Sequence, residues 1–256
     1  MNPRREFLQV TLTGLASLGL SQRGNGPILE RTSPPTIWRG SVRHRYVALT
    51  YDDCYLLRRL LDLEALLADY PEFKVTLFPV GVALLNLESQ DPGVWRRFLD
   101  RGHAIGYHSW DHGGIHVMSP ANAVADFDRW MAALTEVAGS RPTVRFARPP
   151  FGVLSTSFDE LARQRGQVVT MWSTGWGGEL ESGMNAVRHS RNGDIVLLHI
   201  RTQDLATTAE AFKWLRAEGW GAVTLSRLYD DLLRESLESP GCDLGPVPST
   251  PRTCLD

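Results

Sequence analysis

Short β-rich runs alternate with amphipathic stretches through the middle of this 256-residue sequence, and that alternation constrains the fold more than any other feature. The strand candidates are residues 46–51, 75–80, 104–107, 144–147, 168–172, 195–199 and 222–225. The helix candidates are residues 56–70, 94–101, 120–138, 158–165, 184–191 and 205–218. Seven strands that alternate with helices favour an α/β fold, a distorted parallel (β/α)7 barrel, over the alternative of an open doubly wound sheet.

The composition is that of one globular unit with a single core. Hydrophobic residues make up 43% of the chain and charged residues 22%, which is enough apolar material for one substantial domain of this length. The formal net charge of -2 gives no electrostatic reason to expect nucleic acid or an acidic membrane as a partner. We predict neither, and the sequence leaves the oligomeric state open.

Two histidines and an aspartate have the types needed for a divalent metal site. His108 and His112 are spaced i, i+4, which on a helical turn would place both rings on one face. Asp53 would have to come from a different element to complete a two-histidine, one-carboxylate site with a position open for water. A pair with this spacing also arises by chance between unrelated surface or core histidines.

Four segments in a fixed order give the pair its context: Thr50–Cys54 (T-Y-D-D-C), His108–His112, Arg148–Gly152 (R-P-P-F-G) and Leu197–His199. With these segments the chain resembles the polysaccharide deacetylase family, carbohydrate esterase family four or the NodB homology domain, over roughly residues 42–232. Each segment lies at the carboxyl end of a predicted strand, where the reacting groups of a parallel barrel gather.

The resemblance implies a metal and a set of catalytic roles. Asp53, His108 and His112 would hold Zn2+, or another divalent cation such as Co2+. Asp52 would act as the base toward water, although its alternative role is to cap the helix that follows. A metal of this kind activates water and polarises a carbonyl group.

Further roles fall on the later segments. Arg148 would pair with Asp52, and His199 would protonate the departing amine, unless His199 simply ends a buried strand. The backbone N–H of Phe151 would stabilise the oxyanion. Trp172 and Trp176 could stack on sugar rings, although large aromatic residues more often pack in a core or at its rim.

Two positions depart from the family pattern. Ser173 stands where the fourth motif is expected to place an aspartate, which the family uses to support the histidine of the fifth motif. Cys54 replaces the glycine of the first motif, and a small buried apolar residue is its simplest interpretation.

The two ends of the chain differ in character from the middle. Arg4 and Arg5 precede a short apolar run, which predicts a twin-arginine export signal over residues 1–23, followed by a linker over residues 24–41. The catalytic domain would span residues 42–235, and a Pro/Gly-rich tail residues 236–256, with a disulfide between Cys242 and Cys254. The protein would then be periplasmic, in the cell envelope or secreted, with no stable membrane span unless the signal remains uncleaved.

The sequence therefore predicts an exported, metal-dependent hydrolase that removes acetyl groups from a polysaccharide such as peptidoglycan or chitin-like oligomers, as a de-N-acetylase or an O-acetyl esterase. One alternative is a non-catalytic or weakly active carbohydrate-binding protein of the cell surface on the same barrel. Another is a hydrolase of small non-peptide amides.

Overall fold

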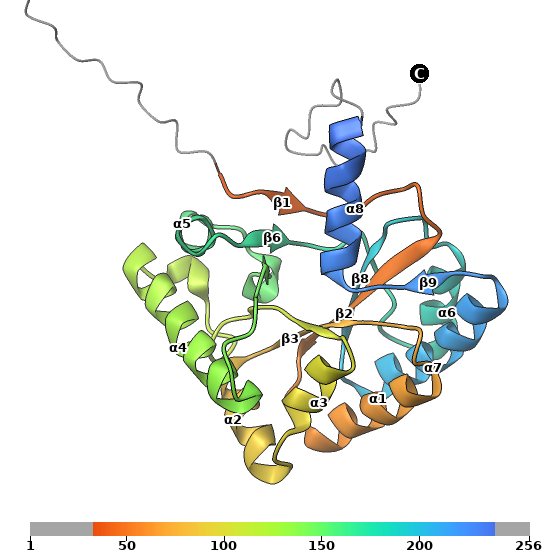
Figure 1. Cartoon of the computed structure of the whole chain (residues 1–256), viewed down its shortest axis with the longest axis horizontal. Helices are drawn as coiled ribbons and strands as arrows, with labels where there is room; N and C mark the ends of the chain where they lie inside the picture. The colour runs from red at the N-terminus through yellow and green to blue at the C-terminus, as the bar shows by residue number, and fades with distance from the viewer. Residues whose placement is uncertain (1–32, 239–256) are drawn as a thin grey trace, which may run out of the picture. The chain divides into compact units, whose positions relative to one another are not determined.

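The computed structural model describes residues 33–238 (Figure 1). The strands are β1 (Thr36–Ile37), β2 (Tyr46–Asp53), β3 (Thr76–Pro79), β4 (Ala104–Ile105), β5 (Phe146–Ala147), β6 (Val168–Thr170), β7 (Thr174–Gly175), β8 (Ile195–His199) and β9 (Gly221–Ala222). The α-helices are α1 (Leu57–Asp69), α2 (Gly81–Gln90), α3 (Val94–Asp100), α4 (Pro120–Ala138), α5 (Thr156–Arg165), α6 (Leu180–Arg188), α7 (Thr202–Ala217) and α8 (Leu225–Glu238). Two short 3-10 helices cover Ile115–Val117 and Pro150–Gly152.

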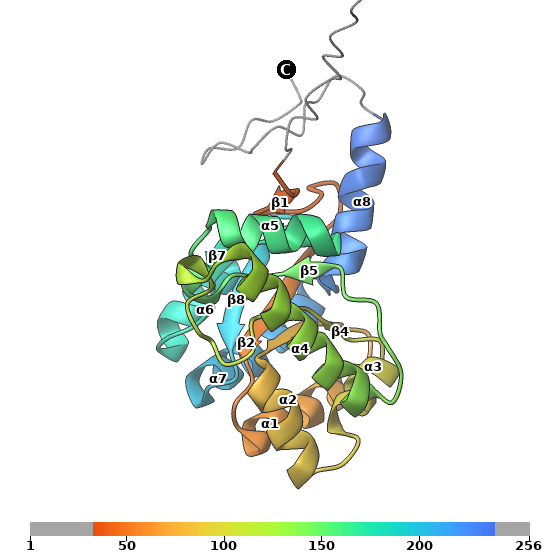
Figure 2. The ribbon, with the colours of Figure 1, turned by 90° about the vertical axis from the view of Figure 1, so that its left-hand side faces the viewer.

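The strands pair in parallel into two sheets that two isolated bridges connect, one of them an antiparallel bridge between Arg39, after β1, and Asp194, before β8. The larger sheet has the order β4-β3-β2-β8-β7, with β9 on the first residues of β2, and the smaller has the order β1-β6-β5. A parallel bridge between Tyr107 and Ala147 joins the end of β4 to β5. Helices lie outside the strands (Figures 1 and 2), so the predicted α/β class and distorted parallel barrel are confirmed.

The side chains of the central strand β2 change from apolar to polar toward its carboxyl end. Val47, Leu49 and Tyr51 pack in the cluster that includes residues of the surrounding helices. The alternate residues Tyr46 and Ala48 pack in a second cluster with side chains from β3, β5, β6, β8 and α8. Because successive side chains of a strand point to opposite faces, the interior face continues through residues 50 and 52 to the carboxyl end of the strand.

Helix α8, most of which lies within the predicted domain of residues 42–235, and strand β1, which precedes that domain, are elements that the sequence did not predict. Leu225 and Leu228 of α8 pack in the second cluster, together with Tyr46 and Ala48 of β2. Tyr46 Oη also donates a 2.5 Å hydrogen bond to Asp231 Oδ2 of α8. Ile37 is buried, and β1 pairs with β6. The prediction of a linker over residues 24–41 is therefore wrong for residues 36–37, because Thr36 and Ile37 pair with β6 as a strand of the smaller sheet.

The predicted signal, the two tail cysteines and residues 24–32 of the predicted linker lie outside the described residues. Within residues 33–238, no helix is both long and apolar enough to span a bilayer.

Candidate metal centre

Asp52 and Asp53 reach the same site because the backbone turns at the end of β2. Asp53 and Cys54 have positive φ angles of 70° and 61°, and the Cys54 N–H donates to the Asp52 carbonyl at 2.9 Å. The Val80 N–H donates to the Asp53 carbonyl at 3.2 Å and holds the turn against β3. Both adjacent carboxylates can therefore face one site, whereas a straight strand would point them apart.

The two histidines lie on an irregular loop after β4. The prediction that His108 and His112 share a helical turn is wrong, since Ser109 and His112 have φ angles of 69° and 64°. Their rings nevertheless meet, with centroids 5.1 Å apart. His108 is buried, and its Nδ1 lies 2.9 Å from the Arg148 carbonyl oxygen, which leaves Nε2 directed toward the aspartates.

The ligand atoms of Asp53, His108 and His112 have the spacing of a metal site. Asp53 Oδ1 lies 3.5 Å from His108 Nε2 and 3.5 Å from His112 Nε2, and the three ligand atoms lie within 4.8 Å of one another. Donors at 2.0–2.2 Å from a tetrahedral zinc ion stand roughly 3.3 Å apart. Asp53 Oδ1 is also buried with no hydrogen-bond partner. A cation would satisfy that oxygen, so these residues fit a divalent metal.

The charges of the site favour an ionised Asp53. Burial raises the pKa of its carboxyl group, but His108, His112 and His199 together outweigh this effect and leave the pKa below its ordinary value. Burial also lowers the pKa of His112, and the neighbouring His108 adds to that effect. The ionised Asp53 and the neutral His112 that these shifts favour are the protonation states that metal ligation needs, whereas Asp52 and Asp53 outweigh burial and raise the pKa of His108.

Asp52 is held by a buried arginine. Arg148 is fully buried, and its Nη1 donates to Asp52 Oδ1 and to Thr50 Oγ1, each at 2.7 Å. Its Nε and Nη2 donate to the carbonyl oxygens of Thr170 and Met171 at 3.2 and 3.1 Å. The alternative role of Asp52 as a helix cap does not apply, because α1 begins after Leu56 with no side-chain cap.

His199 lies beside Asp52 through strand register. In the parallel pairing of β2 with β8, Asp52 is the partner of His199. His199 Nε2 lies 4.0 Å from Asp53 Oδ2, so the ring faces the candidate metal site. The His199 main-chain N–H donates to Asp204 Oδ2 at 2.8 Å.

Ser173 does not occupy a position from which a carboxylate could support His199. Its Oγ donates to Asp194 Oδ1 at 2.7 Å and accepts from the Ile195 N–H at 3.1 Å. These contacts lie at the start of β8, whereas His199 ends that strand. The interpretation of Ser173 as the replaced support of His199 is therefore wrong, because β7 runs parallel to β8 and reaches its end only after Gly175.

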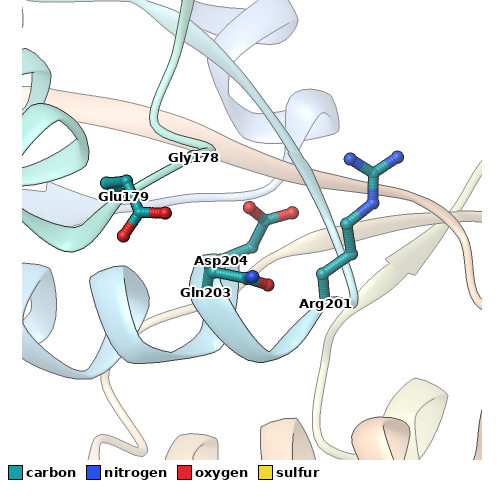
Figure 3. A pocket seen from close by; sticks show the side chains of 5 residues that line it. All are labelled: Gly178, Glu179, Arg201, Gln203 and Asp204. Carbon is teal, nitrogen blue, oxygen red and sulfur yellow. The ribbon is translucent and has the colours of Figure 1, made fainter.

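The carboxylate that does reach this strand end is Asp204, which sequence reasoning missed. Asp204 is buried in the first turn of α7, and a Cβ added at Gly177 would lie 3.0 Å from its Oδ1. An aspartate directly before a predicted helix that follows a strand, a position typical of a helix N-cap, was the available signal. Asp204 also lines a pocket of about 200 Å³ with Gly178, Glu179, Arg201 and Gln203 (Figure 3).

The three aromatic residues predicted to contact the substrate, Phe151 through its backbone N–H and Trp172 and Trp176 through their rings, differ in exposure. Phe151 has a φ of 59°, is 65% exposed and places its ring against His112, with centroids 4.3 Å apart. Trp172 is half-buried, with its ring 5.8 Å from the Arg148 guanidinium. Trp176 is fully buried, and its Nε1 donates to Ser190 Oγ at 3.2 Å. The prediction that Trp176 stacks on sugar is wrong, because the core covers its ring.

Comparisons with known proteins identify the family. The polysaccharide deacetylase family model matches residues 39–169, just over half of the chain. The peptidoglycan-N-acetylglucosamine deacetylase PgdA of Listeria monocytogenes is 27% identical over 168 residues, which are 63% of this chain and 34% of that protein. The chain thus spans about a third of the length of the Listeria protein.

Two further relatives match a larger share of the chain. The peptidoglycan-N-acetylglucosamine deacetylase of Bacillus cereus is 26% identical over 227 residues, with 78% of this chain and 97% of that protein covered. The structure of a carbohydrate esterase family 4 pseudoenzyme from Bacillus anthracis has the same fold, with a TM-score of 0.68, 20% identity and coverage of 78% of this chain and 70% of that one. From the matched model and the four segments gathered at one site, the chain belongs to the polysaccharide deacetylase family.

Proposed function

We propose that the protein is an exported, metal-dependent hydrolase that removes acetyl groups from a polysaccharide. The observation that carries the proposal is the buried, unpartnered Asp53 Oδ1 between His108 and His112, beside an aspartate paired with a buried arginine. A metal set with an adjacent second carboxylate provides both an electrophile and a base. The family membership supports deacetylation as the reaction.

Each residue has a defined part in this reaction. A zinc ion, or another divalent cation such as cobalt, would serve as a Lewis acid when bound by Asp53, His108 and His112. Asp52 takes a proton from the attacking water, and Arg148 keeps its carboxylate oriented. The acetyl C–N or C–O bond then breaks, and the products are acetate and a free amine or alcohol.

Two groups act on the carbonyl and on the leaving atom. The Phe151 N–H stabilises the oxyanion that forms on the acetyl carbonyl oxygen, and Trp172 borders the substrate. His199 donates a proton to the departing nitrogen or oxygen. The pairing of His199 on β8 with Asp52 on β2 supports this role.

The named activities of relatives point to the substrate class. PgdA of Listeria monocytogenes and the Bacillus cereus relative are peptidoglycan-N-acetylglucosamine deacetylases, and a Saccharomyces cerevisiae relative, 27% identical over 136 residues, is a chitin deacetylase. Peptidoglycan and chitin-like oligomers are therefore the first substrates to test. The Arg4–Arg5 pair supports export by the twin-arginine route, and cell fractionation of a variant with both arginines changed to lysine tests that step.

Acetate release decides the main proposal. The purified protein is incubated with peptidoglycan, chitin oligomers and acetylxylan, with and without a chelator, beside the Asp52→Asn variant. We expect release from at least one polymer, with loss on chelation and in the variant. Release that neither treatment reduces would exclude this site as its source.

A second candidate function is carbohydrate binding with weak or no turnover. The observation in its favour is that Asp204 bonds to the main-chain nitrogen of His199 and not to its ring. Binding of chitin oligomers by calorimetry without acetate release from any polymer would favour this function. Release from small amides alone would favour the third alternative, a hydrolase of non-peptide amides.

A further inference from the structure

The loop that carries both histidine ligands has an unfavourable backbone. Ser109 and His112 have positive φ angles, which residues with a side chain adopt only when their surroundings impose them. One contact inside the loop is the His112 N–H to Ser109 Oγ at 3.0 Å. Other contacts that fix this conformation come from neighbouring elements, and those elements also set the spacing of the histidines.

Helix α2 holds the loop through its first amide groups. The Gly81 N–H donates to the Ser109 carbonyl at 3.0 Å, and the Val82 N–H donates to the Trp110 carbonyl at 2.8 Å. A Cβ at Gly81 would come within 2.4 Å of the Trp110 ring, so only glycine allows this approach. These contacts are made by the backbone, and they fix the carbonyl side of the loop.

Helix α4 holds the other side of the loop through one carboxylate. Asp126 Oδ1 accepts a 2.5 Å hydrogen bond from Tyr107 Oη and a 2.9 Å bond from the Trp110 N–H. The guanidinium group of Arg129, one turn further on, stacks 3.6 Å from the Trp110 ring. Asp126 therefore binds residues on both sides of His108, and it contacts neither histidine.

We propose that Asp126 is a positioning residue for the metal site, which sets the separation of His108 and His112 before any ion binds. The inference rests on the metal ligands of the proposed function, but it does not depend on the reaction or substrate. Groups hydrogen-bonded to the metal ligands themselves typically change metal affinity by about 10- to 100-fold when removed, and Asp126 acts on the same ligands through the backbone of their loop. A residue that only supported the fold would affect stability and leave the affinity of the folded protein unchanged.

The test compares Asp126 with a second carboxylate of the same helix. Asp128 is exposed and pairs with Arg165 at 2.6 Å on the outer surface, so Asp128→Ala is the matched control. Asp126→Ala removes both bonds to the loop, Tyr107→Phe removes one, and Asp126→Asn retains an acceptor oxygen. The full-length proteins are titrated with Zn2+ against a chromophoric chelator, and Co2+ absorption spectra report the geometry of the site.

We expect Asp126→Ala to weaken Zn2+ binding by about 10- to 100-fold and to alter the Co2+ spectrum. Tyr107→Phe should give a smaller loss, Asp126→Asn should restore much of the affinity, and Asp128→Ala should match the wild type. Equal affinities and spectra for folded Asp126→Ala and Asp128→Ala would overturn the proposal.

Amide hydrogen exchange separates this inference from the proposed function. In metal-free protein, peptides that cover residues 107–112 should exchange faster in Asp126→Ala than in Asp128→Ala, while peptides of β2 and β8 remain unchanged. If the wild type binds no metal, the proposed function fails, and the exchange result alone then decides whether Asp126 orders the loop. Unchanged loop exchange would refute the role of Asp126 in that case.

Discussion

At the scale of single residues, the pair of Arg148 and Asp52 is the strongest test of how this site is held. Both side chains are buried, and Arg148 donates four hydrogen bonds to its surroundings. Removing one partner of a buried pair leaves an uncompensated charge, which costs about 3–5 kcal/mol. We expect Arg148→Ala to lower the free energy of unfolding by about that amount in urea titrations.

Arg145 provides the control for this prediction. It pairs with Asp230 at 2.7 Å, and both side chains are partly exposed. A pair that solvent screens contributes about 0–1 kcal/mol, so Arg145→Ala should change stability little. Similar losses for the two variants would show that Arg148 is not held as a buried ion pair in solution.

The residue types of the site could be predicted from sequence, but their backbone could not. Within residues 33–238, the positive-φ residues other than glycine are Asp53, Cys54, Ser109, His112 and Phe151. All lie in the segments that carry the family resemblance. Spacing alone indicated a helical turn for the histidines, because the contacts from α2 and α4 that impose the loop are distant in sequence.

At the scale of elements, His103 links the end of α3 and β4 to the start of β3 and makes stability depend on pH. Its Nδ1 accepts from the Val75 N–H at 3.3 Å, and burial, with Lys74 and Arg101, lowers its pKa to about 4. The unfolded chain binds this proton at about pH 6.5. The contribution of neutral His103 is therefore complete above pH 6.5 and is lost as the pH falls toward 4.

This shift of the His103 pKa corresponds to roughly 3–4 kcal/mol at most, at about 1.4 kcal/mol per pH unit. Urea unfolding of metal-free wild type and His103→Gln should give a shallower pH dependence for the variant between pH 6.5 and 4, because glutamine retains an acceptor and does not titrate. Because both proteins are metal-free, the titration of the metal ligands contributes equally to the two pH profiles and cancels in the comparison. Parallel curves for the two proteins would assign the acid sensitivity to other groups.

The same scale shows which elements periodicity can and cannot predict. All seven strand candidates have counterparts, because buried strands leave short β-branched and apolar runs. Helix α2 was missed because its apolar residues extend around the helix, and α8 because the predicted strand 222–225 ended on its first residue, Leu225. Strands β1 and β7 were missed because their surroundings are typical of loops: β1 directly follows Pro34 and Pro35, and β7 consists of Thr174 and Gly175.

At the scale of the whole molecule, the candidate metal site joins parts of the chain that are far apart in sequence. Asp53 ends β2, whereas His108 and His112 follow β4, and the order of the sheet places β3 between these strands. The unfolded chain has no such set of ligands at the right spacing. A cation that binds this set must therefore favour the folded state.

Metal removal should consequently lower the thermal midpoint. At a free metal concentration of about 100 times the dissociation constant, binding adds about 2.7 kcal/mol to the free energy of unfolding. For a domain of this size, that corresponds to a midpoint roughly 5–10 °C higher with Zn2+ than in a chelator. Differential scanning calorimetry of the full chain, with and without Zn2+, measures the difference.

The variant His112→Ala should remove most of this Zn2+-dependent increase in the midpoint, because it removes one ligand. The variant should still fold, because His112 is half-exposed and its loss leaves the buried Asp52–Arg148 pair in place. A variant that kept the full Zn2+ effect would locate the ion elsewhere in the protein.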